Sequence, residues 1–176
     1  MDSAEQDISS TTRTMITFST HGTRFTYRVA GILVHNGRVL FQYAPDEHFW
    51  FLPGGRAELG ESSIESIKRE IREELGVEPH TERLLFVNEN LFTFQGELHH
   101  ELGLYFLLSL PSDAAVYHAG GTFSLEEETE HILLTYHWLP VEQLETLPVY
   151  PIFLRRELVS LPQETKHIIE VEPEGA

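Results

Sequence analysis

The sequence predicts a single mixed α/β domain of the α+β type, in which a β-sheet is sandwiched between helices. Two observations support this prediction: strand-like segments occur before and after one amphipathic helix, and 41% of the 176 residues are hydrophobic. A chain of this length commonly forms one domain and can bury a core. Strands on both sides of a helix along the chain favour a sheet that is covered by helices.

The first predicted elements form a β-hairpin. Residues 25–33 and 38–43 are rich in β-branched and aromatic side chains, and the turn signal His35-Asn36-Gly37 separates them. The Asn-Gly pair is a strong hairpin signal, because both residues tolerate the positive φ of a tight turn. A short apolar segment at 49–52 follows and ends at Pro53.

The clearest helix is predicted at residues 62–75. Ser62 and Glu65 have the spacing of a capping box, and Gly76 stands where a helix commonly ends. Apolar side chains recur in this segment at spacings of three, four and four, which predicts one buried helix face. That face consists of Ile64, Ile67, Ile71 and Leu75.

The chain after this helix is expected to add three strands and two helical segments around one long polar loop. The strand segments are rich in apolar, β-branched and aromatic residues, whereas the loop is polar and acidic. The strands are expected at 83–88, 102–110 and 132–139, the loop at 111–130, and the helical segments at 141–144 and 152–161.

The amino-acid composition of the two ends sets the expected domain boundaries. The Ser- and Thr-rich residues 1–22 are expected to be a flexible segment, and 162–176 an acidic tail. The domain itself is expected to cover 23–161.

Composition excludes several classes of function. The formal charge of −16 leaves no basic stripe for a nucleic acid, and the lack of cysteine excludes disulfides and thiolate metal sites. No apolar run is long enough to span a membrane, and the start of the chain lacks the apolar core of a signal peptide. We therefore expect a cytoplasmic protein without a membrane or nucleic-acid partner.

Three carboxylates lie close together on the predicted helix. Glu70 and Glu74 are one helical turn apart, and Glu73 lies beside them. Their mutual repulsion would be relieved by a hard divalent cation such as Mg²⁺, which prefers oxygen ligands. The alternative is a solvated acidic helix face whose charge is offset by Arg69 and Arg72.

These carboxylates belong to a longer motif. After Gly55 come five residues, then Glu61, seven residues, and the segment REIREELGV at 69–77. The pattern resembles the Nudix box, G-x5-E-x7-R-E-U-x-E-E-x-G-U, in which U is an aliphatic residue, and every fixed position matches. The likeness extends over roughly 25–158, so the chain resembles MutT-like Nudix hydrolases, and their mixed sheet between helices is the implied fold.

The resemblance implies a Mg²⁺-dependent hydrolase, with Mn²⁺ as a substitute, that cleaves the pyrophosphate bond of a nucleoside diphosphate linked to another moiety. Carried over by position, Glu70 and Glu74 would be the principal metal ligands, and Glu73 would bind a second ion or position water. The backbone of Gly55 would approach the metal, and Arg69 would orient the carboxylates. Metal ions would neutralise the pyrophosphate and activate water for attack on phosphorus.

The resemblance implies that the general base lies on a loop outside the box. A loop glutamate could reach a metal-bound water in the substrate complex. We favour Glu130, and if no loop residue serves, Glu73 becomes the leading candidate. The loop candidates are Glu101, Glu127, Glu128 and Glu130.

The remaining site residues keep alternative roles. Arg28 and Glu101 are expected to contact substrate, and Phe92 would either stack on a base or fill the core. Glu61 would either brace the loop against the helix or contact the metal.

The sequence narrows the substrate only to a class. The segment FTFQ at 92–95 matches neither the ADP-ribose nor the dinucleoside polyphosphate signature of the family, so the substrate is expected only to be a small nucleotide. The alternative function is a nucleotide-binding module without catalysis on the same fold. Whether the protein forms a homodimer is also open.

Overall fold

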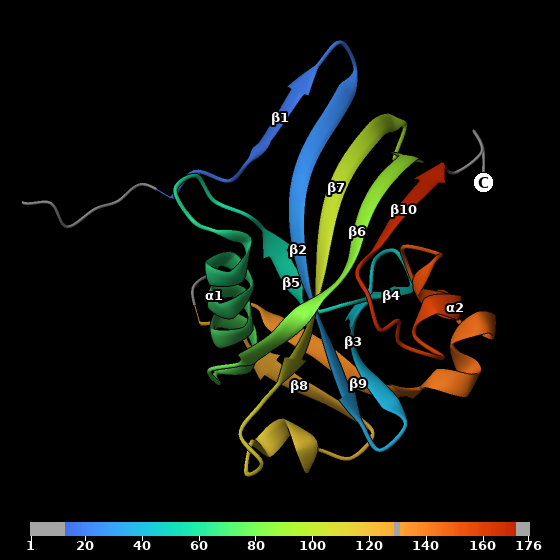
Figure 1. Ribbon diagram of the computed structural model, residues 1–176. Coiled ribbons are helices and arrows are strands. Elements are labelled where there is room, and N and C mark those ends of the chain that lie inside the picture. The colour runs from blue at the N-terminus through green and yellow to red at the C-terminus, as the bar shows by residue number, and fades with distance from the viewer. Residues whose placement is uncertain (1–12, 129–130, 172–176) are drawn as a thin grey trace, which may run out of the picture.

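The computed structural model describes residues 13–128 and 131–171, which form a mixed β-sheet with helices packed against it (Figure 1). This arrangement confirms the predicted fold class. The helices are α1 (Ser63–Leu75) and α2 (Leu154–Glu157), with 3₁₀ turns η1 (Ala115–Tyr117) and η2 (Val141–Thr146). The strands are β1 (Thr17–Thr20), β2 (Thr23–His35), β3 (Arg38–Ala44), β4 (Phe49–Phe51), β5 (Gly54–Arg56), β6 (His80–Phe94), β7 (Glu97–Ser109), β8 (Thr122–Glu126), β9 (Leu133–Pro140) and β10 (Lys166–Val171).

Strand β2 organises the sheet, whose order in the described part of the chain is β10-β6-β7-β2-β3-β9-β8. It runs parallel to β7 and antiparallel to β1, β3 and β5. The predicted hairpin is confirmed, since Asn36 and Gly37 connect β2 to β3 with φ values of 49° and 72°. The pairing with β5 brings the turn at Gly54 and Gly55 against the middle of β2.

Helix α1 begins and ends where the sequence predicts. Both hydrogen bonds of the capping box between Ser62 and Glu65 are present, and Gly76 closes the helix in the left-handed conformation. Ile67 and Ile71 are fully buried against the sheet. Ile64 is 47% exposed, so the prediction that it belongs to the buried face is wrong. Its angular position fits, but it lies in the first helical turn, outside the core cluster that holds the later positions of the face.

The two faces of the sheet carry separate cores. Val29 and Leu33 of β2 face α1, whereas Ala30 and Ile32 face the segment around α2. This alternation follows from the two-residue period of a strand. Residues 29–33 of β2 are covered on both faces and are all buried, which explains why this part of the strand carries no charged or strongly polar side chain.

Three predictions for the second half of the chain need correction. The expected loop at 111–130 contains η1 and strand β8, where Phe123 and Leu125 alternate with polar residues. The helix expected at 152–161 is reduced to α2, a single turn. The strands expected at 83–88 and 102–110 are longer than predicted, because they pair with each other as β6 and β7 nearly to the turn that joins them, and Phe92 therefore lies within β6.

The expected domain boundaries also change. Strand β1 lies inside the segment 1–22 and pairs with β2, and β10 lies inside 162–176 and pairs in parallel with β6. Both strands are short and partly exposed, so their own patterns are weak, and pairing with a long neighbour stabilises them. Within the described ranges, no helix combines the length and the apolar character that crossing a membrane requires.

Candidate active site

The carboxylates of α1 lie against the turn that leads into β5. The Glu74 side chain is buried and accepts a hydrogen bond of 3.1 Å from the backbone N–H of Gly54. Glu70 lies against Gly55 so closely that a Cβ at this glycine would be 2.5 Å from the carboxylate. Only glycine leaves room for this approach. We call Glu70, Glu73, Glu74 and the backbone of Gly54 and Gly55 the acidic site.

Arg69 is the charge at the centre of these carboxylates. Its guanidinium lies 2.8 Å from Glu70, 3.0 Å from Glu61 and 3.3 Å from Glu73. It also lies 3.6 Å from Glu58, and it donates to the Arg56 carbonyl. The structure therefore places Arg69 where it can orient the carboxylates.

Glu61 faces Arg69 rather than the turn at Gly55. It accepts hydrogen bonds from the Arg69 guanidinium and from Ser66 Oγ at 2.8 Å. Although burial raises its pKa, these hydrogen bonds hold the pKa of Glu61 below its ordinary value. Of its two expected roles, the contacts match the brace between the loop and the helix.

Burial raises the pKa values of the two most buried carboxylates of the acidic site. Loss of solvation raises the pKa of Glu74 to about 8, and the charges of Glu70 and Glu127 act in the same direction. Burial also raises the pKa of Glu70, although Arg69 opposes this change. Ionised carboxylates are therefore costly here unless a further positive charge is bound.

The loop after β8 brings a further carboxylate to the site. The backbone N–H of Glu128 donates to the Glu73 carbonyl at 2.9 Å, which fixes the loop to the end of α1. Glu127 is buried, and its charge acts on Glu74. Of the expected bases, Glu128 is exposed, Glu101 is half-buried on β7, and Glu130 lies outside the described residues.

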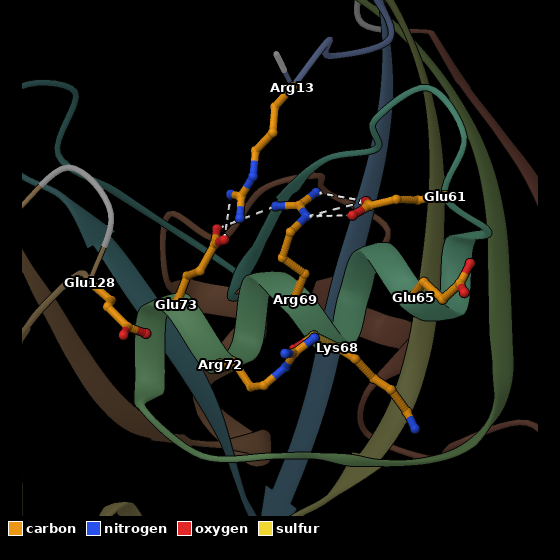
Figure 2. Close-up of a pocket in the computed structure, with 8 residues that line it drawn as sticks. All are labelled: Arg13, Glu61, Glu65, Lys68, Arg69, Arg72, Glu73 and Glu128. Atoms are coloured by element: carbon orange, nitrogen blue, oxygen red, sulfur yellow. Dashed lines mark hydrogen bonds and ion pairs between the residues drawn. The ribbon is translucent and has the colours of Figure 1, made fainter. Parts of the chain in front are cut away.

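An arginine that the sequence does not point to also reaches the site. Arg13 Nη1 donates to Glu73 at 2.5 Å, and the backbone before β1 is held in place by a hydrogen bond from Leu59 N–H to the Thr14 carbonyl. Figure 2 shows the Arg13 side chain reaching toward Glu73 of α1 from a segment outside the helix. Both residues line a cavity of about 540 Å³. The cavity is lined by Arg13, Glu61, Glu65, Lys68, Arg69, Arg72, Glu73 and Glu128.

The predicted substrate-binding residues lie on the opposite face of the sheet from α1. Arg28 donates to the Leu52 carbonyl at 3.1 Å and to the Gly54 carbonyl at 3.5 Å, with its guanidinium over the Phe51 ring. Phe92 stacks on His99 with ring centroids 4.9 Å apart. Burial raises the pKa of Glu101, and Arg28 partly offsets this effect.

The acidic site suits a hard divalent cation in its donor chemistry. Buried carboxylate oxygens next to a glycine turn are ligands that Mg²⁺ and Mn²⁺ accept, and Mg²⁺ commonly uses only one or two protein carboxylates. Across the described part of the chain, no three acidic or histidine side chains converge on one point at metal-binding distance. The ion pairs of Arg69 with Glu70 and Glu73 explain this, because they hold these carboxylates toward the guanidinium.

Comparison with known proteins identifies the family. The family model for the NUDIX domain matches residues 25–158, so the chain belongs to the Nudix family. Human 8-oxo-dGDP phosphatase NUDT18 is 48% identical over 40 residues, which are 23% of this chain and 12% of that protein. The match thus spans about an eighth of the length of this curated relative.

Solved structures show the same fold. The MutT protein from Bacillus halodurans superimposes with a TM-score of 0.60 at 18% identity, covering 85% of this chain and 91% of that chain. An ADP-ribose pyrophosphatase from Streptococcus suis superimposes with a TM-score of 0.53 at 13% identity. The superposition covers 82% of this chain and 98% of that chain.

Proposed function

We propose that the protein is a Mg²⁺-dependent pyrophosphohydrolase that cleaves a nucleoside diphosphate linked to another moiety, with Mn²⁺ able to replace Mg²⁺. The observation that carries the proposal is the buried carboxylate of Glu74 beside Glu70, packed on the turn at Gly54 and Gly55. Membership of the Nudix family supports it. The names of the two relatives with stated substrates, an 8-oxo-dGDP phosphatase and an ADP-ribose pyrophosphatase, support the substrate class.

We assign a task to each residue of the site. Glu70, Glu74 and the Gly55 backbone hold the cation, and Glu73 binds a second ion or positions water. The bound metal supplies charge neutralisation of the pyrophosphate and lowers the pKa of water. Arg69 keeps the carboxylates oriented, because its guanidinium contacts Glu70 and Glu73 together.

The base is proposed on the loop after β8. Glu130 remains our predicted base, and Glu127 is the candidate that lies buried beside Glu74 within the described residues. Four single variants test this assignment, in which Glu101, Glu127, Glu128 or Glu130 is replaced by Gln. One of the four should lose rate severely, by about 10²–10⁴-fold. If all four variants keep their rates within a few-fold, the base is Glu73.

A substrate panel tests the function. The protein is incubated with Mg²⁺ and with 8-oxo-dGDP, ADP-ribose, nucleoside triphosphates, dinucleotides and UDP-sugars, and mononucleotide and phosphate release are measured. We expect turnover of at least one compound, loss of most activity in Glu74→Gln, and normal activity in Glu78→Gln. Glu78 is a matched control because it is an exposed carboxylate paired with Arg72 outside the site. Binding without turnover by well-folded, metal-loaded protein would favour the alternative of a binding module.

A further inference from the structure

One face of the sheet carries a group of polar side chains that the acidic site does not use. In the strand register, Arg28 of β2 lies opposite Gly103 of β7, and Gly103 lies opposite Asn88 of β6. Glu101 and Asn90 are paired in the next row. Cross-strand neighbours, and residues two apart along a strand, point to the same face. We call the set on this face the polar patch: Arg28, Asn88, Asn90, Glu101 and Tyr105.

The polar patch contains buried groups whose hydrogen bonds are not made. Among the described residues, both amide atoms of Asn88, Oδ1 of Asn90 and the Tyr105 hydroxyl are buried without a hydrogen-bond partner. Asn88 does lie beside the Tyr105 hydroxyl, at a geometry that falls short of a hydrogen bond. Asn88 is fully buried and Asn90 is 5% exposed. Because buried polar groups are normally paired, several such atoms in one place indicate an interior site that a polar partner would complete.

The polar patch is connected to the acidic site by a single residue. Arg28 donates to the Gly54 carbonyl, and the Gly54 N–H donates to Glu74. In the inference below, the phosphates of the bound molecule lie at the acidic site, its other end lies at the patch, and Arg28 stands between the two. Glycine at position 103 matters here, because a Cβ would lie 2.7 Å from the Tyr105 ring, which crosses this position.

The chemistry of the patch fits a nucleobase. Asparagine amides offer both a donor and an acceptor, and these pair with the edge of a base. In the adjoining row of the same face, Phe92 and His99 form a flat stacked pair with an interplanar angle of 18°. A stacked aromatic pair beside mixed donors and acceptors matches a planar ring with a polar edge better than a sugar.

We infer that Asn88 and Asn90 are specificity-determining residues that recognise the base of the nucleotide substrate, an inference that rests on the proposed function. The binding step is tested without catalysis, by calorimetric titration in EDTA with AMP, GMP, CMP and UMP, and with ribose 5-phosphate as the probe that lacks a base. We expect the wild type to bind at least one nucleotide about tenfold more tightly than ribose 5-phosphate. In Asn88→Leu and Asn90→Leu this preference falls below about threefold, because the leucine offers no hydrogen bonds.

Stability separates recognition from damage to the fold. Replacing unpaired buried amides by leucine should raise the midpoint of thermal unfolding, by about 2–4 °C, while base preference is lost. Thr81→Val is the matched control, since its buried hydroxyl is also without a partner within the described part of the chain, at the far end of the same strand. It should raise the midpoint and keep the base preference. Asn90→Ser, which adds no bulk, should lose the preference even if the leucine variants do not fold.

The outcomes distinguish this inference from the proposed function. Equal binding of all nucleotides and ribose 5-phosphate by the wild type overturns the inference, as does a base preference that survives in all the asparagine variants. Hydrolysis in the Mg²⁺ panel is measured separately, so a protein that selects bases in EDTA without turnover contradicts only the proposed function. Hydrolysis without base selection contradicts only the inference.

Discussion

Arg69 is the residue on which the arrangement of the acidic site depends. Although burial lowers its pKa, hydrogen bonds to Glu61 and Glu70 raise the pKa of Arg69 above its ordinary value, so the guanidinium stays charged. Removing it would leave several carboxylates repelling each other around a buried space. Arg13 differs, because its side chain is half-exposed and its ion pair with Glu73 contributes little to stability.

The raised pKa of Glu74 should make the stability of the metal-free protein depend on pH. Its folded-state pKa of about 8 exceeds the ordinary value of 4.5, so between these values the folded state binds a proton that the unfolded state releases. The free energy of unfolding should therefore fall as pH rises from 4.5 to 8. Glu74→Gln should flatten this fall and stabilise the protein at pH 8, by at most about 4 kcal/mol.

Urea unfolding in EDTA at pH 5 and pH 8 measures this effect. Glu78→Gln serves as the control, because Glu78 is an exposed carboxylate and its substitution should leave the slope unchanged. Equal slopes in the wild type and in Glu74→Gln would show that Glu74 titrates normally. Added Mg²⁺ should raise the stability of the wild type at pH 8, because a ligand that binds only the folded state stabilises it.

At the scale of elements, helix α1 combines local signals with tertiary packing. The capping box and the glycine at its end are local, so the sequence predicts both ends of the helix correctly. Which apolar positions are buried depends on how far the sheet extends beneath the helix. Ile64 therefore follows the predicted stripe and is still exposed.

Alanine substitutions along α1 should distinguish the buried positions Ile67 and Ile71 from the exposed position Ile64. Ile67→Ala and Ile71→Ala should each lower the free energy of unfolding by about 2–5 kcal/mol, because both side chains are fully buried. Ile64→Ala should cost less than about 1 kcal/mol, because alanine favours the helix and little burial is lost. Chemical denaturation of the three variants gives the comparison. A loss at Ile64 as large as at Ile67 would mean that Ile64 is covered in solution.

At the scale of the whole molecule, the two ends of the described chain complete the sheet. Strand β10 runs parallel to β6, and Ile168 packs on the core that contains α2. Without β10, the backbone of β6 would become an open sheet edge. The segment after the domain is thus part of the fold.

A pair of truncations tests this role of β10. Ending the chain after residue 161 should lower the midpoint of thermal unfolding by several degrees and promote aggregation, because β6 loses its neighbour. Ending it after residue 171 removes only 172–176 and should leave the midpoint unchanged. Identical melting of the two truncated chains would contradict a stabilising role for β10.

The sequence by itself determined the features that depend on neighbouring residues. These include the turn between β2 and β3, the caps of α1, and the acidic helix with its motif, because each arises within a few residues. Strand propensity in the second half also identified the cores of β6, β7 and β9. Such features can be predicted from the sequence because the residues that form the interaction are the same residues that make up the sequence pattern.

Only the tertiary structure decided which distant residues meet. The contact of Arg13 with Glu73 and the pairing of β10 with β6 each join segments about 60 or more residues apart. The row of Asn88, Gly103 and Arg28 depends on the register of three strands, which one strand alone does not specify. These features depend on how strands pair across the sheet, and that pairing is settled by burial on both faces of the whole domain.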